Sequence, residues 1–88
     1  TMESTISRYY VRISVLDKPG VLAQIAAAFG RNGVSLHSVI QQGRGEPVFL
    51  VFVTHEVSEA DFLKAIEEIK PLDCVFQIDN VIRVEVEA

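Results

Sequence analysis

The stretch Asp-Lys-Pro-Gly-Val-Leu at residues 17–22 stands where a strand pattern ends and a helix pattern begins. Proline fixes its own φ angle and suits the first turn of a helix. Glycine lets another group approach its backbone because it has no Cβ. The first turn of a helix leaves amide N–H groups unpaired and carries a partial positive charge. We therefore predict that this turn can hold a small anion, such as a carboxylate or a phosphate.

Periodicity on both sides of this turn predicts the first three elements. Residues 8–15 alternate between apolar and polar, which is typical of a strand with one face on a core. Residues 19–31 have apolar side chains at helical spacing, and Gly30 and Gly33 bracket the end of that helix. A second strand is predicted over 34–42, where one face carries the even-numbered residues Val34, Leu36, Ser38 and Ile40.

The second half of the chain predicts one more helix between two strands. A turn at 43–47 makes the strand at 48–55 antiparallel to the one before it. That strand is apolar on both faces, as central strands are. A helix is predicted over 58–70, with polar residues at capping-box spacing at its start. Residues 74–86 supply the last strand, which is interrupted at Asp79-Asn80.

The predicted order is β-α-β-β-α-β, which is that of a ferredoxin-like α+β fold. Right-handed crossovers place both helices on one face of a four-stranded antiparallel sheet, in the spatial order 4-1-3-2. The strand at 48–55 is then central, and the helices cover only one of its apolar faces. A second domain or a second copy of the chain is the simplest cover for the other face.

Composition limits the class of protein. The chain has 88 residues, enough for one small domain, and its formal net charge of −4 argues against binding to a nucleic-acid backbone. It contains neither an apolar run of the roughly 20 residues that a membrane span needs nor a signal-peptide pattern. The single cysteine, Cys74, excludes an internal disulfide and fits a reducing compartment, so we expect a cytoplasmic protein with no membrane partner.

The start of the chain predicts a division into two parts. The sequence opens Thr-Met-Glu-Ser-Thr, with methionine in second place. We interpret residues 1–7 as a linker or a remnant of an expression vector, and residues 8–88 as the domain itself. On this interpretation the domain is a fragment of a longer enzyme.

Three functions that the ferredoxin-like fold hosts lack the residues they need. An RNA-recognition motif needs aromatic residues after a basic residue and a glycine, whereas Arg44-Gly45 is followed by Glu46-Pro47. A copper or zinc carrier needs Cys-x-x-Cys near the first loop. An enzyme of the acylphosphatase type needs an arginine there to hold a phosphate. The first loop contains neither.

The sequence also predicts no catalytic residue and no metal site. It shows no triad and no paired acids in a plausible cleft, which makes a free-standing small hydrolase a poor alternative. His37 and His55 lie on different predicted strands and have no metal-ligand spacing. Cys74 is expected to be a small buried hydrophobe rather than a nucleophile.

One family matches the motifs along the chain between residues 8 and 85. The pattern Asp-x-Pro-Gly-Val-Leu follows the first strand, and Asn32-Gly33 precedes the second. In these features the chain resembles the ACT domain, a regulatory module that binds amino acids. The segments Ser-Val-Ile-Gln-Gln at 38–42 and Val-Ile-Arg-Val-Glu at 81–85 resemble, more narrowly, the C-terminal ACT domain of bacterial homoserine dehydrogenases.

This resemblance implies allosteric feedback regulation of an enzyme of amino-acid biosynthesis. Homoserine dehydrogenase is an oxidoreductase that reduces aspartate semialdehyde to homoserine with NAD(P)H, and its catalytic domains are not in this sequence. Because the sequence has no Gly-x-Gly-x-x-Gly pattern, we expect this chain alone neither to bind NAD(P) nor to catalyse. Threonine, the pathway product, is the effector that the resemblance implies.

The resemblance further implies a homodimer. ACT domains pair side by side into a continuous eight-stranded sheet or stack face to face, and the amino acid binds at their interface, near the first loop and the second strand. Two alternatives stay open. In one, the paired domains only dimerise the enzyme and bind no effector; in the other, the domain belongs to another enzyme of amino-acid metabolism.

The candidate effector-binding residues come first from the turn at the helix start. The amides of Gly20, Val21 and Leu22 are expected to receive the carboxylate of the effector. Asp17 either pairs with the ammonium group of the effector or caps the helix, since aspartate is a preferred cap.

Three further candidates lie after the helix. Asn32 either binds polar groups of the ligand or ends the helix, because asparagine tolerates the left-handed conformation. Ser35 and Gln41 face outward on the second strand and are expected to meet a ligand or a partner copy. An edge strand with unpaired amides is itself a template for dimerisation.

Overall fold

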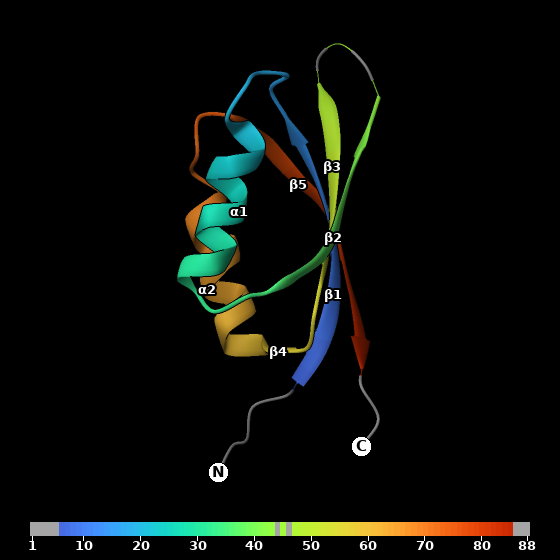
Figure 1. Cartoon of the computed structure of the whole chain (residues 1–88), viewed down its shortest axis with the longest axis vertical. Coiled ribbons are helices and arrows are strands. Elements are labelled where there is room, and N and C mark those ends of the chain that lie inside the picture. The colour runs from blue at the N-terminus through green and yellow to red at the C-terminus, as the bar shows by residue number, and fades with distance from the viewer. Residues whose placement is uncertain (1–5, 44, 46, 86–88) are drawn as a thin grey trace.

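A four-stranded core sheet is covered on one face by two helices (Figure 1). The structure, a computed structural model, describes residues 6–43, 45 and 47–85, so most of the predicted linker lies outside the described residues. Within them, the elements in chain order are β1 (Ile6–Val15), α1 (Val21–Arg31), β2 (Leu36–Gln42), β3 (Val48–Thr54), β4 (Val57–Ser58), α2 (Glu59–Ile69) and β5 (Val75–Glu85).

The predicted ferredoxin-like topology is confirmed. The long strands lie in the order β2-β3-β1-β5, and each neighbouring pair is antiparallel. The predicted last strand is β5, which runs through Asp79-Asn80 without ending because register shifts absorb the extra residues. The side chain of Ser14 donates a hydrogen bond of 2.5 Å to Asp79 at one of these shifts.

The sequence did not predict the two-residue strand β4. It pairs with the start of β1 through Ile6↔Ser58 and Ser7↔Val57, on the same edge of β1 that β3 occupies further along. Between the two ladders the backbone N–H of Tyr9 donates to the hydroxyl of Thr54 at 3.0 Å. A side chain therefore replaces a backbone acceptor where the ladder is interrupted. β1 begins at Ile6, two residues before the predicted start.

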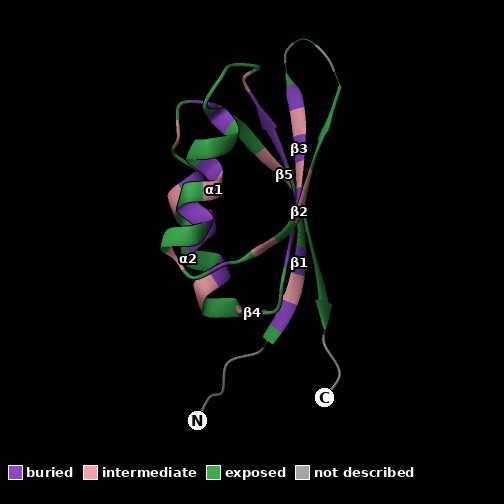
Figure 2. Ribbon diagram, in the orientation of Figure 1, coloured by how far each residue is buried: buried purple, intermediate pink, exposed green. Residues whose placement is uncertain are grey.

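The core lies between the sheet and the two helices, where the buried residues gather (Figure 2). Aromatic rings form its centre. Tyr9 of β1 stacks on Phe62 of α2 with ring centroids 3.8 Å apart. Phe29 of α1 lies 5.2 Å from Phe52 of β3 and 6.5 Å from Phe62. Aromatic side chains bury the largest areas available to a small domain, so this contact between four elements fixes how the helices lie on the sheet.

A β-bulge in β2 overturns the predicted division of its side chains between the two faces. Leu36 pairs with Thr54 and Ser38 with Val53, so His37 and Ser38 together face one residue of β3. A bulge shifts the alternation by one residue. Val39 therefore packs against the core, and Ile40, which was predicted to share a face with Leu36, is 54% exposed on the other face.

The two helices begin in different ways. α1 starts at Val21, after Gly20 at φ 86°, so the prediction that Pro19 opens the helix is wrong. The turn at 18–20 ends before the helix because a left-handed residue cannot continue a right-handed helix. α2 begins as predicted, since the side chain of Ser58 accepts a hydrogen bond of 3.2 Å from the backbone of Asp61. Of the described helices, none is long and apolar enough to cross a membrane.

The face of the sheet opposite the helices carries exposed apolar side chains. Among them, Tyr10, Ile40, Ile82 and Val84 are 42% to 55% exposed. The guanidinium of Arg12 lies over the ring of Phe49, 4.2 Å from its centroid, in a cation–π contact. These side chains come from β1, β2, β3 and β5, so the face that we expected to need a cover extends over all four strands.

Replacing Phe62 with alanine is expected to destabilise the domain strongly. The side chain is 1% exposed and touches two other rings, so its removal leaves a cavity and costs about 3–5 kcal/mol. Leu63→Ala is the matched control, because Leu63 is its neighbour on α2 and is 50% exposed. It should cost less than about 1 kcal/mol. Urea unfolding of both variants measures the difference, and equal losses would contradict this packing.

Candidate functional site

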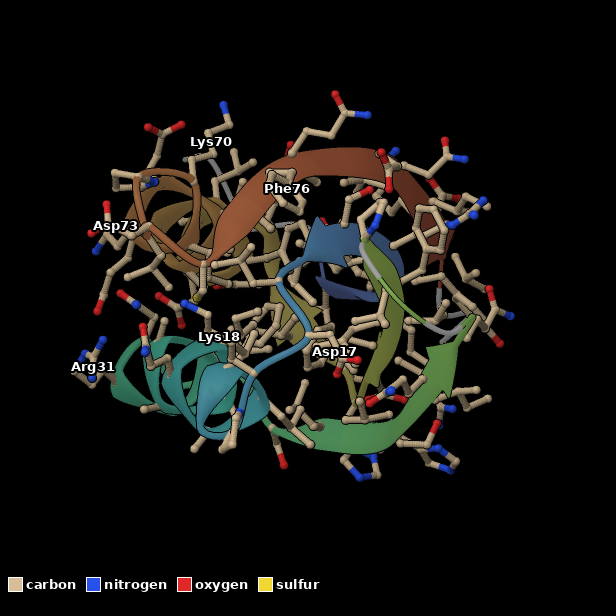
Figure 3. All side chains as sticks on the ribbon, turned by 90° about the horizontal axis from the view of Figure 1, so that it is seen from above. Asp17, Lys18, Arg31, Lys70, Asp73 and Phe76 are labelled. Carbon is tan, nitrogen blue, oxygen red and sulfur yellow. The ribbon has the colours of Figure 1, made fainter. Side chains whose placement is uncertain are left out.

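A cavity of about 230 Å³ lies beneath the loop that joins β1 to α1. The end of β1, the loop and the first turn of α1 form one wall, and the ends of β2 and β3 form the other. Figure 3 looks down on this end of the molecule. The lining residues are Val15, Leu16, Asp17, Lys18, Pro19, Gly20, Val21, Leu22, Gln41, Val48 and Leu50.

Backbone amides at the start of α1 supply the positive side of the cavity. The N–H of Gln24 donates to Gly20 at 3.0 Å, and the N–H of Val21 makes only a long bond of 3.4 Å to Lys18. In the described part of the chain, the amides of Leu22 and Ala23 have no acceptor. No side chain caps the helix and no acidic residue stands in its first turn. An anion placed here meets free donors and the positive end of the helix.

Gly20 creates this turn through its backbone and not through close packing. Its φ of 86° lies in the left-handed region, and an added Cβ would meet nothing within 4 Å. We predicted that glycine allows a close neighbour here. The structure shows instead that position 20 favours glycine because of its left-handed backbone conformation. The two residues that follow this turn, Val21 and Leu22, line the cavity.

The charged and apolar groups of the cavity are arranged around these amides. Asp17 and Lys18 are its charged lining residues, and Figure 3 shows Asp17 on the side of the loop that faces β2 and β3. The buried side chains of Val15, Val48 and Leu50 form an apolar floor. A carboxylate, an ammonium group and a short aliphatic side chain on one small molecule would each meet a complementary group.

The structure brings together five of the seven predicted site residues. Those five line the cavity: Asp17, Gly20, Val21, Leu22 and Gln41. Gln41 belongs to it because it pairs with Leu50 and lies on the helix side of the sheet. It shares that face with Leu36 only because of the bulge at His37, whereas the sequence placed the two on opposite faces.

Asn32 lies at the other end of α1, outside the cavity. Its side-chain amide donates 2.8 Å hydrogen bonds to the carbonyl of Ala28 and to the carboxylate of Glu68 on α2. Arg31 binds the same carboxylate through its Nε at 2.6 Å and also through Nη2. In this chain Asn32 ends one helix and joins it to the other.

Ser35 also lies away from the cavity. It stands just before β2, where its carbonyl accepts a hydrogen bond of 2.8 Å from the backbone N–H of His55. Gln41 lines the cavity near one end of β2, and Ser35 lies just before the other end. The length of β2 therefore separates Ser35 from the loop. Neither Ser35 nor Asn32 therefore reaches a ligand in the cavity of its own chain.

Sequence reasoning missed the apolar floor of the site. Val48 and Leu50 come from β3 and Val15 from the end of β1, so they meet only once the sheet has formed. Their signal in the sequence is the same apolar pattern that predicts a core strand. Nothing in that pattern distinguishes a side chain under a loop from one under a helix.

The cavity is small. Its volume of about 230 Å³ is below the roughly 300–1,000 Å³ that larger ligands occupy. Among the described residues no three His, Cys, Asp or Glu side chains gather at one point. The cavity volume is of the size of a single amino acid.

Comparison with known proteins agrees with this description. The family profile of the ACT domain matches residues 9–74. The chain is 42% identical over 84 residues to a homoserine dehydrogenase of Synechocystis sp., covering 94% of this chain and 19% of the relative. It is 37% identical to the homoserine dehydrogenase of Corynebacterium glutamicum, covering 92% of this chain and 18% of the relative. The chain thus spans about a fifth of the length of the curated relatives it matches.

Two solved structures are similar in fold. A homoserine dehydrogenase from Thiobacillus denitrificans superposes with a TM-score of 0.80 at 30% identity, covering 97% of this chain and 18% of that one. The regulatory subunit of aspartate kinase from Thermus thermophilus superposes with a TM-score of 0.60 at 18% identity, covering 94% of this chain and 52% of that one. The second likeness is one of fold alone.

Alanine at positions 20 and 30 should have opposite effects on stability. Gly20→Ala puts a Cβ in the left-handed region and is expected to cost about 1–2 kcal/mol. Gly30→Ala, inside α1 with nothing within 4 Å of the added Cβ, is expected to gain about 0.5–1 kcal/mol. Urea unfolding measures both free energies. A loss at both positions would contradict the assigned backbone of the loop.

The contact between Asn32 and Glu68 should make stability depend on pH. The amide of Asn32 and the guanidinium of Arg31 lower the pKa of the Glu68 carboxyl below its ordinary 4.5. The stabilisation is therefore present above the ordinary value and is lost as the pH falls through the lowered one. Wild type should exceed Glu68→Gln in urea midpoint at neutral pH, and the gap should close in acid. An Asn32→Ala background should narrow the gap, and a gap of constant size at all pH values would refute the link.

Proposed function

The chain belongs to the ACT domain family, and we propose that it is the regulatory domain of a homoserine dehydrogenase. The similarity to these enzymes over nearly the whole chain supports this assignment. In the proposed enzyme, which is cytoplasmic, other domains reduce aspartate semialdehyde with NAD(P)H. This domain senses an amino acid and lowers the activity of those domains.

The cavity beneath the β1–α1 loop is the observation that carries the proposal. The carboxylate of an amino acid binds the free amide of Leu22, which lines the cavity, and that of Ala23 next to it in the chain. Its ammonium group lies against the carboxylate of Asp17. The three charged or polar contacts of a zwitterion with this loop leave its side chain directed at the floor of the cavity.

Threonine is the ligand that we propose for this cavity. Its methyl group suits the apolar floor formed by Val48 and Leu50, and its hydroxyl suits the amide of Gln41 beside them. A site that hydrogen-bonds a ligand hydroxyl discriminates strongly against an analogue without one, because the polar group of the site is then left unpaired. Valine, which replaces the hydroxyl with a methyl group, is therefore the natural competitor to test.

A second copy of the chain completes the site in this proposal. β2 is an edge strand, and two edge strands paired antiparallel about a two-fold axis place the start of one beside the end of the other. The partner's Ser35 then approaches Gln41, and the partner's Asn32 lies behind it. This arrangement supports all seven predicted residues as one shared site, and the homodimer has a continuous sheet.

Regulation follows from differential binding between two states of the enzyme. Threonine stabilises the paired, less active state by no more than its difference in affinity for the two states. Such coupling is typically about 1–3 kcal/mol, or a change of about 5–150-fold in the affinity of the linked site. A domain of this size needs no chemistry of its own to exert feedback.

The second candidate function is dimerisation without an effector. The exposed apolar side chains on the open face of the sheet favour it, because that face needs a cover whether or not a ligand binds. In that case the two copies stack face to face and the edge strand β2 stays unpaired. An ACT domain of a different amino-acid enzyme would instead keep the cavity and bind another effector.

Calorimetry with the wild-type chain and two neighbouring variants tests the proposal. Threonine should bind with measurable heat, and Gln41→Leu should weaken it about tenfold or more, since a hydrogen bond to the hydroxyl is lost. Gln42→Ala is the matched control, because Gln42 pairs with Phe49 on the opposite face. It should leave the affinity unchanged, and valine should bind more weakly than threonine to the wild type.

Sedimentation of the same samples separates the candidates. A dimer that becomes tighter with threonine supports the sensing function. A dimer with no heat from threonine at several millimolar supports the dimerisation module and refutes sensing by this chain. Equal weakening by the substitutions at positions 41 and 42 would place the ligand outside the cavity.

A further inference from the structure

The two histidines of the chain meet on the sheet although they are far apart in the sequence. His37 lies in the bulge of β2, and His55 follows the last residue of β3. Their ring centroids are 5.2 Å apart and the ring planes are inclined by 70°. The hydrogen bond from the backbone N–H of His55 to the carbonyl of Ser35, at 2.8 Å, ties the two strands together at this point.

The bulge is what brings the rings together. His37 and Ser38 both face Val53, and the Ser35–His55 bond continues the pairing one step beyond Leu36↔Thr54. His37 and His55 are thus diagonal neighbours on one face of the sheet. Bulges redirect side chains and are frequent beside functional sites.

Neither imidazole packs in the core of the fold. Both residues are exposed, so they contribute little to the core. Within the described part of the chain, the mutual contact is the only side-chain interaction recorded for either ring. Their nitrogen lone pairs are therefore accessible from solvent.

The separation of the rings suits a shared metal ion. A zinc ion binds imidazole nitrogen at about 2.0–2.1 Å, and two such ligands at a tetrahedral angle have ring centres about 5 Å apart. The observed 5.2 Å agrees with this value. Both side chains are exposed, so their rings are free to change rotamer when an ion binds.

We propose that His37 and His55 together bind one divalent transition-metal ion, with water completing its coordination. Imidazole ligands select zinc, nickel and copper, whereas magnesium and calcium prefer oxygen. The ion bridges β2 and β3 at the end of β2 opposite Gln41, so the site is separate from the amino-acid cavity of the same chain. Binding of metal does not depend on the proposed function.

Titration of the chain with zinc chloride or nickel chloride alone, at about pH 7.5, tests the site. We expect one ion per chain and no comparable binding of magnesium chloride. His37→Gln and His55→Gln should each weaken binding about tenfold or more, because either change leaves only one nitrogen ligand. Glu56→Gln is the control beside His55, and it should change the affinity less than about twofold if the imidazoles alone hold the ion.

A second measurement locates the ion directly. Paramagnetic nickel should broaden the amide NMR signals of residues near 35–38 and 53–57 and leave those of residues 75–77, on the opposite edge of the sheet, sharp. Amide spectra of the two histidine variants without metal are the control for their folding. Undiminished binding after loss of either histidine, equal binding of magnesium, or broadening centred elsewhere would overturn the proposal.

Discussion

The pairing of β1 on both of its edges is the constraint on which the rest of the structure depends. Its hydrogen bonds hold β3 and β4 on one side and β5 on the other. Its inward face presents Tyr9 to Phe62 and so attaches α2 to the sheet. Because β1 ends beneath the start of α1, the loop that leaves it must turn sharply over the ends of β2 and β3. The cavity is the space left under that turn.

The local periodicity of the sequence predicts much of this fold. Alternation in β1 and helical spacing in both helices predict the elements, and the doubly apolar β3 predicts its central place. The bulge at His37 was not predictable, because the apolar pattern of residues 34–40 continues through it unchanged. Such a bulge is decided by pairing with β3, which is a contact between strands and not a property of one strand.

The candidate site also has a part that the sequence predicts and a part that it does not. The turn at 17–22 was predicted because a helix start has its own residue chemistry, whereas Val48 and Leu50 meet it only through the sheet. Asn32 and Ser35 entered the prediction partly through resemblance to a family, and the fold of one chain leaves them at the far ends of α1 and β2. A site shared by two copies has no signature in the pattern of a single copy. The sequence also contains no sign that His37 and His55 meet, because they lie on different strands and form no ligand motif.

The contact of Arg12 with Phe49 has a consequence for colloidal behaviour. A flat sheet face rich in exposed side chains such as Ile82 invites indiscriminate association with other unfolded or partly folded chains. A guanidinium lying on an aromatic ring keeps a full charge at the middle of that face while covering part of its apolar area. Any surface that packs against this face must therefore tolerate or reposition this charge. The charge of one arginine thus opposes association of this face with other apolar surfaces.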